Sequence, residues 1–173
     1  MDLTGHQSAV LARFDGLMVP VSAPQEFLGD VAQLAATLFE PLDVQCSITL
    51  HTFNQFVSVA HTSPTVEIVE ELQNHLDGSP ALNSLLRDAS TVVDDTSSDE
   101  RWPEYLGSVA QHGYGSILSV CLITTKVTRA TMNFYAHPIR SFTPGMVHAA
   151  EHFASHAARR LRGILRTPTL PAA

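Results

Sequence analysis

Two pairs of short β-prone runs, each joined across a few residues, constrain the fold of this chain more than any other feature. Residues 46–50 and 56–60 flank a link at 51–55, and the strongly apolar run 116–123 precedes the run 128–135 across a turn near Lys126. Neighbouring β-prone runs with a short connection are typical of β-hairpins, whose two strands pair antiparallel. We therefore expect an antiparallel β-sheet.

Segments of helical character lie before, between and after these hairpins. Apolar residues recur at helical spacing through 24–38, and the dipeptides Ser63-Pro64, Ser79-Pro80 and Thr143-Pro144 each place an N-cap residue before a proline at the first helical position. A short strand is expected at 91–93 and a helix at 103–111. This order predicts an α+β fold, with a central antiparallel β-sheet covered by helices on both faces.

The length of 173 residues fits one domain with one core. Hydrophobic residues make up 45% and charged residues 16%, which favours a packed interior over a disordered chain. We expect an N-terminal arm at 1–22, the domain at 23–166 and a C-terminal tail at 167–173.

The charge balance disfavours direct binding of nucleic acid, because ten Lys and Arg residues face 17 Asp and Glu residues and the net charge is −7. Ten of the acids lie in 67–104, where Arg87 and Arg101 are the bases, whereas residues 159–166 carry four arginines. We interpret both segments as solvated faces rather than as binding patches. On the predicted helix after Ser63, Val66 and Val69 mark the buried face, and the acids are expected on the opposite one.

Two further patterns concern cellular location and cysteine chemistry. The sequence lacks a run of about 20 apolar residues, and its N-terminus has no cation before Arg13, so we expect a cytoplasmic protein with no membrane partner. Cys46 and Cys121 lie inside apolar runs without the spacing of a metal site, which indicates two buried, reduced thiols.

Several segments, taken in order, resemble the GAF sensor domains, especially the actinobacterial kind that precedes an RNA-binding ANTAR output domain. The resemblance covers about residues 24 to 160 and rests on the sequences Leu76-Asp77-Gly78-Ser79-Pro80, Val92-Val93-Asp94-Asp95, Arg101-Trp102-Pro103, Gly115-Ser116-Ile117-Leu118-Ser119-Val120, Met132-Asn133-Phe134-Tyr135 and Phe142-Thr143.

The resemblance implies a GAF/PAS-like sheet with the first and last helices on one face and a small-molecule pocket under the inner helices on the other. GAF domains bind cyclic nucleotides, tetrapyrroles or other small effectors, or they dimerise. RNA-binding helices do not follow the last predicted helix in this sequence, so we expect either action through a separate output protein or an output domain that has been lost.

Strand alternation indicates which side chains face the implied pocket. Residues 131, 133 and 135 share one face of their strand, and a face that carries Asn133, Tyr135 and Ser119 is too polar for packing alone. The loop and helix expected to cover it supply aromatic residues, which are typical of small-molecule sites. The predicted pocket residues are Trp102, Tyr105, His112, Tyr114, Ser119, Asn133 and Tyr135, although each aromatic residue alone is also compatible with an ordinary core.

The ligand is less constrained than the pocket. Cyclic-nucleotide-binding relatives carry a motif that begins Asn-Lys, which this sequence lacks, and the acidic segment disfavours a phosphate, so we expect a neutral or cationic small molecule or none. We expect no metal and no haem: His112 is a weak signal for haem. His148, His152 and His156 share a helix face and could hold zinc, but a polar face explains them as well.

The last predicted helix carries a second stripe at heptad spacing, which favours a homodimer built from the first and last helices. The alternative is that the stripe packs on the chain's own sheet. The predicted interface residues are Val147, Ala150, Ala154, Ala157, Leu161 and Ile164.

These patterns together predict a dimeric, small-molecule-sensing regulatory domain for signal transduction, with transcription regulation as its setting. The alternative is a ligand-free dimerisation or interaction module. The lesser alternative is a GAF-type methionine sulfoxide reductase, which the positions of Cys46 and Cys121 inside strands disfavour. We expect no enzyme, because the sequence lacks a nucleophile on a strand-to-helix turn and a glycine-rich phosphate loop.

Overall fold

The computed structural model describes residues 3–19, 23–52, 55–125 and 128–165. The elements follow the predicted order, with one additional helix near the N-terminus. They are α1 (Gly5–Gly16), α2 (Pro24–Ala36), the 3-10 helix η1 (Thr37–Phe39), β1 (Val44–Thr52), β2 (Gln55–His61), α3 (Pro64–Leu72), α4 (Pro80–Arg87), β3 (Thr91–Val93), α5 (Pro103–Gln111), β4 (Ser116–Thr124), β5 (Arg129–Ala136) and α6 (Pro144–Leu165).

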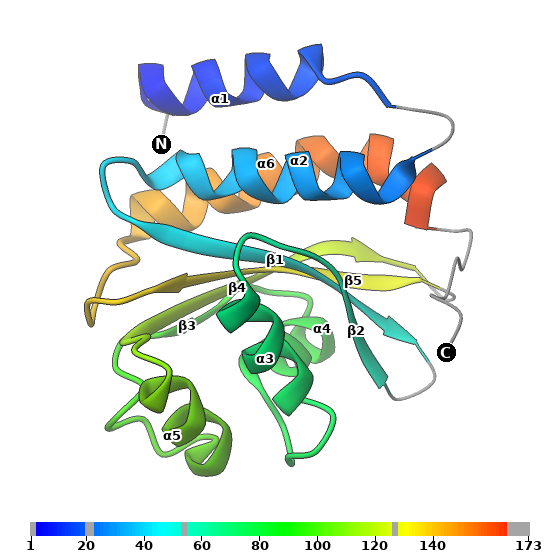
Figure 1. Ribbon diagram of the computed structural model, residues 1–173. Coiled ribbons are helices and arrows are strands. Elements are labelled where there is room, and N and C mark those ends of the chain that lie inside the picture. The colour runs from blue at the N-terminus through cyan, green and yellow to red at the C-terminus, as the bar shows by residue number, and fades with distance from the viewer. Residues whose placement is uncertain (1–2, 20–22, 53–54, 126–127, 166–173) are drawn as a thin grey trace.

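The five strands form one antiparallel sheet in the order β2-β1-β5-β4-β3. Helices α2 and α6 cover one face, which we call the outer face, and α3, α4 and α5 lie on the other, the inner face (Figure 1). The predicted α+β architecture with helices on both faces of a central antiparallel sheet is therefore confirmed.

Predicted N-caps begin two of the inner helices, α3 and α4. The Ser63 and Ser79 hydroxyls accept hydrogen bonds from the amides of Val66 and Leu82, and a proline follows each cap at the first helical position. Ser79 is itself buried, so α4 begins inside the molecule, beneath the sheet.

Helix α1 adds a third layer above α2 and α6 within the segment predicted as an N-terminal arm (Figure 1). Its Val10 and Phe14 are buried, and the Phe14 ring meets Phe153 of α6 edge-on at 5.5 Å between centroids. The Arg160 guanidinium of α6 lies over the Phe14 ring, 5.0 Å from its centroid. This segment is thus packed on the domain through α6.

The heptad stripe of α6 packs inside the chain and does not form a free surface. Ala150, Ala154, Ala157 and Leu161 are buried in the core between α6, α2 and the outer face, and Val147 is half-buried against that core. The side chain of Ile164 lies outside the described residues. The prediction that Ala150, Ala154, Ala157 and Leu161 form a dimer interface is therefore wrong, because the heptad spacing of a dimer seam and the spacing of a single core-facing helix coincide here.

Candidate functional site

The centre of the inner face is polar. Asn133 of β5 lies opposite Ser47 of β1 on one side and Ser119 of β4 on the other. One step along, Thr131 lies between Thr49 and Cys121. Five of these six residues are buried, and Cys121 is half-buried. Two cross-strand rows of small polar side chains thus occupy the place where a sheet ordinarily carries apolar packing.

The carboxylate of Glu70 on α3 is buried against these rows, with 1% of the residue exposed. Its Oε1 accepts hydrogen bonds from the Ser47 hydroxyl at 2.5 Å, the Asn133 amide at 3.0 Å and the Tyr135 hydroxyl at 2.6 Å. Its Oε2 accepts from the Thr49 hydroxyl and the Gln73 amide, both at 2.7 Å. Five neutral donors, four from β1 and β5 and one from Gln73 just after α3, therefore converge on one carboxylate.

The hydrogen bonds continue from Glu70 to the start of α4. Gln73 Nε2 donates to Glu70, and Gln73 Oε1 accepts from the Ser79 hydroxyl at 2.5 Å. That hydroxyl also caps α4 by accepting the Leu82 amide at 3.2 Å. The first turn of α4 is thereby linked through two side chains to the buried carboxylate.

Two tyrosines complete the cluster. The Tyr135 hydroxyl lies 3.2 Å from that of Tyr105 on α5. Burial, and then the charge of Glu70, raises the pKa of Tyr135 well above its ordinary value, and the same causes raise the pKa of Tyr105. Both phenols consequently stay protonated at neutral pH, and Tyr135 remains a hydrogen-bond donor to Glu70.

Two polar atoms beside the cluster are left over. Among the described residues, Asn133 Oδ1 and Thr131 Oγ1 are buried without a hydrogen-bond partner. Buried side-chain polar atoms are normally paired, so an orphan acceptor on a polar sheet face indicates a place for a further bound group.

The structure brings together most of the predicted pocket residues. Asn133, Tyr135 and Tyr105 belong to the Glu70 cluster, and Ser119 is buried opposite Asn133. Tyr114 packs on Tyr135, with 5.4 Å between the ring centroids.

The two other predicted pocket residues lie at the edge of this region. Trp102 is half-buried and packs against a cluster of buried apolar residues on the inner face, among them Val66, Leu106 and Ile117. The His112 ring makes a hydrogen bond with the Ser108 carbonyl of its own helix. The predicted residues on the strands therefore lie together, whereas Trp102 and His112, expected in the loop and helix that cover the pocket, lie at its edge.

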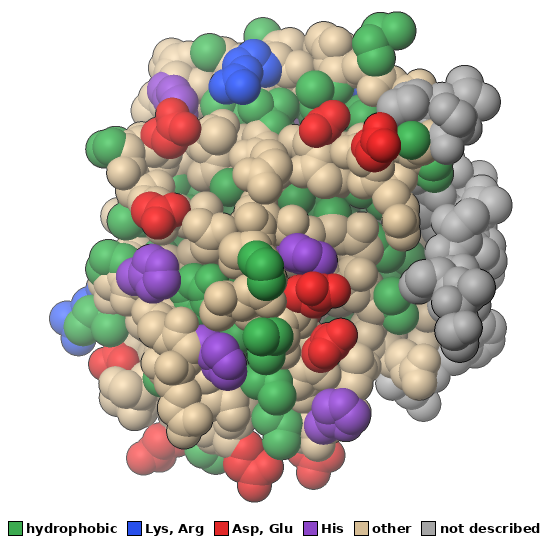
Figure 2. Space-filling view, viewed as in Figure 1, with side chains coloured by type: hydrophobic (Ala, Val, Ile, Leu, Met, Phe, Trp, Pro, Cys, Tyr) green, Lys and Arg blue, Asp and Glu red, His purple; other side chains and the backbone are tan. Residues whose placement is uncertain are grey.

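Glu70 and Gln73 are the residues that sequence reasoning missed. Glu70 was expected on the solvated face of α3, and this is wrong: it lies one turn after Val66 and therefore shares that residue's buried face. The spacing 66, 70, 73 carries the signal, because it continues the apolar stripe with two polar residues. Other acids of the segment, among them Glu67, Glu71, Asp77 and Glu104, are exposed, and acidic side chains prevail over basic ones around α3 and α5 in Figure 2.

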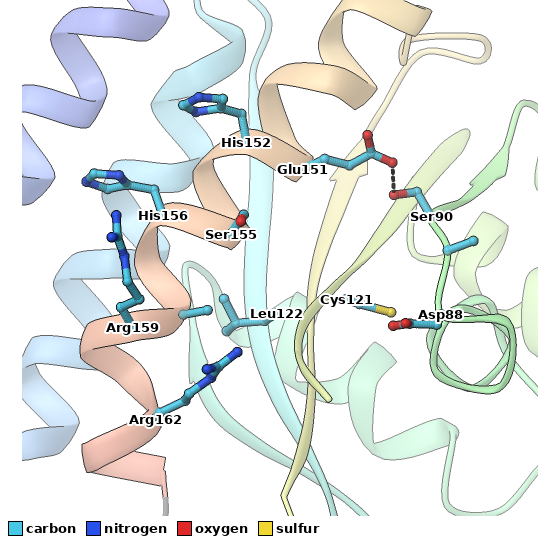
Figure 3. A pocket seen from close by; sticks show the side chains of 12 residues that line it. Asp88, Ser90, Cys121, Leu122, Glu151, His152, Ser155, His156, Arg159 and Arg162 are labelled. Carbon is cyan, nitrogen blue, oxygen red and sulfur yellow. Dashed lines mark hydrogen bonds between the residues drawn. The ribbon is translucent and has the colours of Figure 1, made fainter. Parts of the chain in front are cut away.

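A separate groove of about 700 Å³ lies at the edge of the sheet, between α6 and the residues after α4 (Figure 3). Cys121 and Leu122 of β4 line it, and Glu151 of α6 points across to Ser90, whose hydroxyl donates to the carboxylate at 2.6 Å. Arg162 points into the same space. The groove therefore lies between the residues that follow α4 and the outer helix α6.

The three histidines of α6 do not converge. The rings of His148 and His152 lie 6.4 Å apart, and His156 Nε2 lies 2.7 Å from Oδ1 of Asp15. His152 and His156 lie on α6 among the residues that line the groove (Figure 3). Within the described part of the chain, no group of three His, Cys, Asp or Glu residues has metal-binding geometry.

The two cysteines lie on opposite faces of the sheet. Cys46 is buried in the outer core, and burial, followed by the charge of Glu70, raises the pKa of its thiol. Cys121 lies on the inner side, with its thiol 3.1 Å from the Ser84 carbonyl. The two thiols therefore do not share a pocket.

No helix among the described residues is long and apolar enough to cross a membrane.

One comparison with known proteins identifies a family. A family model for the GAF domain matches residues 23–162. No curated protein matches the chain.

Three similar solved structures illustrate the fold. The GAF domain of a phosphoenolpyruvate-protein phosphotransferase from Acinetobacter is 19% identical, with 94% of each chain covered and a TM-score of 0.63. A GAF domain/HD domain protein from Geobacter sulfurreducens is 15% identical, covering 83% of this chain and 94% of the other, with a TM-score of 0.60. A free methionine-R-sulfoxide reductase from Neisseria meningitidis, solved with its substrate, is 11% identical, covering 92% and 90%, with a TM-score of 0.68. At these identities the likeness shows the fold alone.

Proposed function

Because the chain is a member of the GAF domain family, we propose that it acts as a regulatory sensor domain that binds a small molecule on the inner face of its sheet. GAF domains are commonly signal-sensing regulatory modules. The association with ANTAR output domains and a role in transcription regulation remain predictions from sequence.

One observation carries the proposal: a buried carboxylate lies on a polar sheet face that also holds unpaired acceptors. Glu70 takes five hydrogen bonds there, while Asn133 Oδ1 and Thr131 Oγ1 take none among the described residues. Burying a carboxylate costs free energy that apolar packing of similar volume would not cost. A binding role explains its presence better than packing does.

The hydrogen bonds around α4 supply a route from this site to the outer helices. At its start, α4 is tied through Ser79 and Gln73 to Glu70. Beyond its end, Ser90 is bonded to Glu151 of α6. An effector that draws Glu70 away from Gln73 would release the first turn of α4, and we propose that this shift changes the position of α6.

We retain the homodimer as part of the proposal, but with a different surface. Since Ala150, Ala154, Ala157 and Leu161 are buried within the chain, we propose that a dimer built from the first and last helices uses the exposed residues of α1 and α6. A separate output protein is the other partner that the proposal includes.

A specific observation favours the ligand-free module as the second candidate. Asn133 and Tyr135 are fully buried, and their side-chain donors are already bonded to Glu70. If the domain binds no ligand, the Glu70 side chain occupies the place of one, and the domain serves only to associate with a partner protein or a second copy. The sensor proposal requires that part of this cluster open to admit the effector.

The reductase alternative is less well supported by the thiol positions. Reductases occur among the solved structures that share the fold, but Cys46 and Cys121 lie on opposite faces of the sheet, and a pair of thiols that act together must meet. We therefore assign no reductase activity to the chain.

Native mass spectrometry of the purified protein tests the proposal, because it reports oligomeric mass and any bound small molecule together. We expect a dimer and, after extracts of the source cells are added, an adduct of a few hundred daltons that disappears on denaturation. A Glu70→Gln variant should lose this adduct, and Glu71→Gln, which changes an exposed neighbour, should retain it. A protein that never acquires an adduct would favour the ligand-free module.

A further inference from the structure

The charge of Glu70 has no counter-ion in its surroundings. Its five hydrogen-bond partners are Ser47, Thr49, Gln73, Asn133 and Tyr135, all of which are neutral. In the described part of the chain, no Lys, Arg or His forms an ion pair with it. The cation on the same face of β5, Arg129, donates to the Leu85 carbonyl oxygen instead. A carboxylate out of water is costly unless it is paired with opposite charge, so a cation bound beside Glu70 would neutralise a charge that no ion pair among the described residues compensates.

The donors of Asn133 and Tyr135 are already bonded to Glu70, and the amide oxygen of Asn133 remains as an unpaired acceptor in the part of the chain that the structure describes. Asn133 Nδ2 donates to the carboxylate and lies 3.3 Å from Ser47 Oγ, which fixes the orientation of the amide and leaves Oδ1 on the other side. Asn133 Oδ1 and Thr131 Oγ1 both belong to the inner face of β5, and each lacks a partner among the described residues. An N–H donor would satisfy Asn133 Oδ1, which can only accept, and the Thr131 hydroxyl can accept from it as well. Of these two groups, only the Thr131 hydroxyl could donate to an anion, and that anion would lie beside the carboxylate of Glu70.

From these two observations, and on the premise of the proposed function, we propose that the effector carries a primary ammonium group that binds between Glu70 and Asn133. An ammonium group has one positive charge and three donors and no acceptor. It can bond to the Glu70 carboxylate and to Asn133 Oδ1, two groups already joined by the 3.0 Å bond from Asn133 Nδ2 to Glu70 Oε1. Charge-assisted bonds of this kind are stronger than neutral ones, so the ammonium group determines recognition.

Matched triplets of small probes test the ammonium group separately from binding itself. We propose propylamine, propanol and propionate as one triplet, and benzylamine, benzyl alcohol and benzoate as another, at equal ionic strength and pH 7. Binding is followed by thermal shift and by chemical-shift changes in the NMR spectrum of the labelled protein. We expect saturable binding by at least one amine, with its alcohol and carboxylate counterparts binding at least about tenfold more weakly.

Two variants place the interaction on the named residues. Glu70→Gln keeps the size of the side chain and removes its charge, and we expect amine affinity to fall at least about tenfold, whereas Glu71→Gln should leave it unchanged. If Glu70→Gln fails to fold, Thr131→Val serves, because the hydroxyl it removes has no hydrogen-bond partner in the described chain. This variant should fold as well as the parent and bind the amine severalfold more weakly.

The outcomes separate the two proposals. The proposal that an ammonium group is recognised would be overturned if an amine and its alcohol bound equally. It would also be overturned if Glu70→Gln folded and left the amine affinity unchanged. In both cases the sensor proposal would stand. Binding of a compound without a positive charge, found with cell extracts after all amines fail, would do the same. If neither probes nor extracts produce any bound species, both proposals fail together.

Discussion

The Tyr135 hydroxyl of β5 donates a hydrogen bond of 2.6 Å to Glu70 of α3, two residues separated by 65 positions in the sequence. Both residues are essentially inaccessible to solvent. The bond therefore attaches the inner helix layer to the middle of the sheet, and it depends on a carboxylate that could not be replaced by an apolar side chain without orphaning several donors.

The first prediction concerns stability. Glu70→Ala leaves the hydroxyls and amides that now meet the carboxylate without an acceptor, and we expect a loss of about 3 to 5 kcal/mol in the free energy of unfolding. Urea denaturation followed by circular dichroism measures it. Glu71→Ala, at an exposed position on the same helix, should change the free energy by less than about 0.5 kcal/mol. Equal effects of the two substitutions would mean that the buried cluster does not stabilise the fold.

The fold was largely predictable because local signals agreed with one another. Serine-proline pairs marked the helix starts at Ser63 and Ser79, and period-two alternation assigned Asn133 and Tyr135 to the inner face. Both signals depend on residues that are close to one another in the sequence, so the sequence alone contains them. Glu70 was missed for the converse reason: four of its five donors come from strands 21 to 65 positions away, and charge alone favours the surface.

The α6 stripe illustrates a different limit. The positions of residues such as Ala154 and Leu161 are compatible with a helix dimer and also with a helix packed on its own sheet. A heptad seam and a core-facing stripe share the spacing of three and four residues. Only the position of α2 and the sheet decides between them. Once these elements are placed, the stripe is buried within the chain.

The second prediction concerns the thiols. Cys121 is half-buried and lines the groove beside α6, whereas Cys46 is buried and its thiol pKa is raised by burial and by the charge of Glu70. We expect an aromatic disulfide reagent at pH 8 to modify one thiol in the native protein and the second only after unfolding, because the thiolate is the reactive form. Cys121→Ser should abolish the native reaction and Cys46→Ser should leave it unchanged. A native reaction that survives in Cys121→Ser would contradict the burial of Cys46.

The third prediction concerns pH. Hydrogen bonding and the charge of Arg101 hold the pKa of Asp99 below its usual value of 3.8. A carboxylate with a lowered folded-state pKa contributes stability above its unfolded pKa and loses that contribution as the pH falls through the folded one. Asp99→Asn should therefore be destabilised at pH 7, by less than about 1 kcal/mol because Arg101 is half-exposed. The difference from the parent should shrink as the pH falls below 3.8 through the lowered pKa of Asp99.

Urea unfolding curves at several pH values measure this difference. Glu100→Gln is the matched control, since it removes one exposed carboxylate from the same loop. A difference between Asp99→Asn and the parent that stays constant from pH 7 to pH 3 would show that the ion pair is not its source.

The fourth prediction concerns two glycines. A Cβ atom on Gly115 would lie 2.5 Å from the His137 carbonyl oxygen and 2.9 Å from the Ile139 amide nitrogen, and both atoms belong to the backbone. Gly115→Ala should therefore destabilise the protein by more than about 2 kcal/mol. Gly107 of α5 has open space around its Cβ position, so Gly107→Ala should add about 0.5 to 1 kcal/mol. Melting temperatures that move in the same direction would refute the steric argument.

The last prediction concerns the attachment of α1. The Arg160 guanidinium donates to the carbonyl oxygens of Phe14 and Leu17, which end α1, and it lies over the rings of Phe14 and Phe27 at 5.0 and 5.1 Å from their centroids. Lysine keeps the charge but lacks the planar fork that reaches two acceptors while stacking on a ring. In Arg160→Lys we expect α1 to detach more readily, because its final carbonyl groups lose their partners.

Hydrogen exchange resolved by peptide measures this detachment. Amides of residues 5–16 should exchange at least about tenfold faster in Arg160→Lys, which corresponds to a loss of about 1.4 kcal/mol of local stability. Exchange in β1 and β5 should stay within twofold of the parent, since the sheet core does not depend on this arginine. Arg159→Lys, at the neighbouring exposed position, should leave α1 unchanged. If α1 keeps its protection in Arg160→Lys, the apolar contacts of Val10 and Phe14 alone hold it on α6.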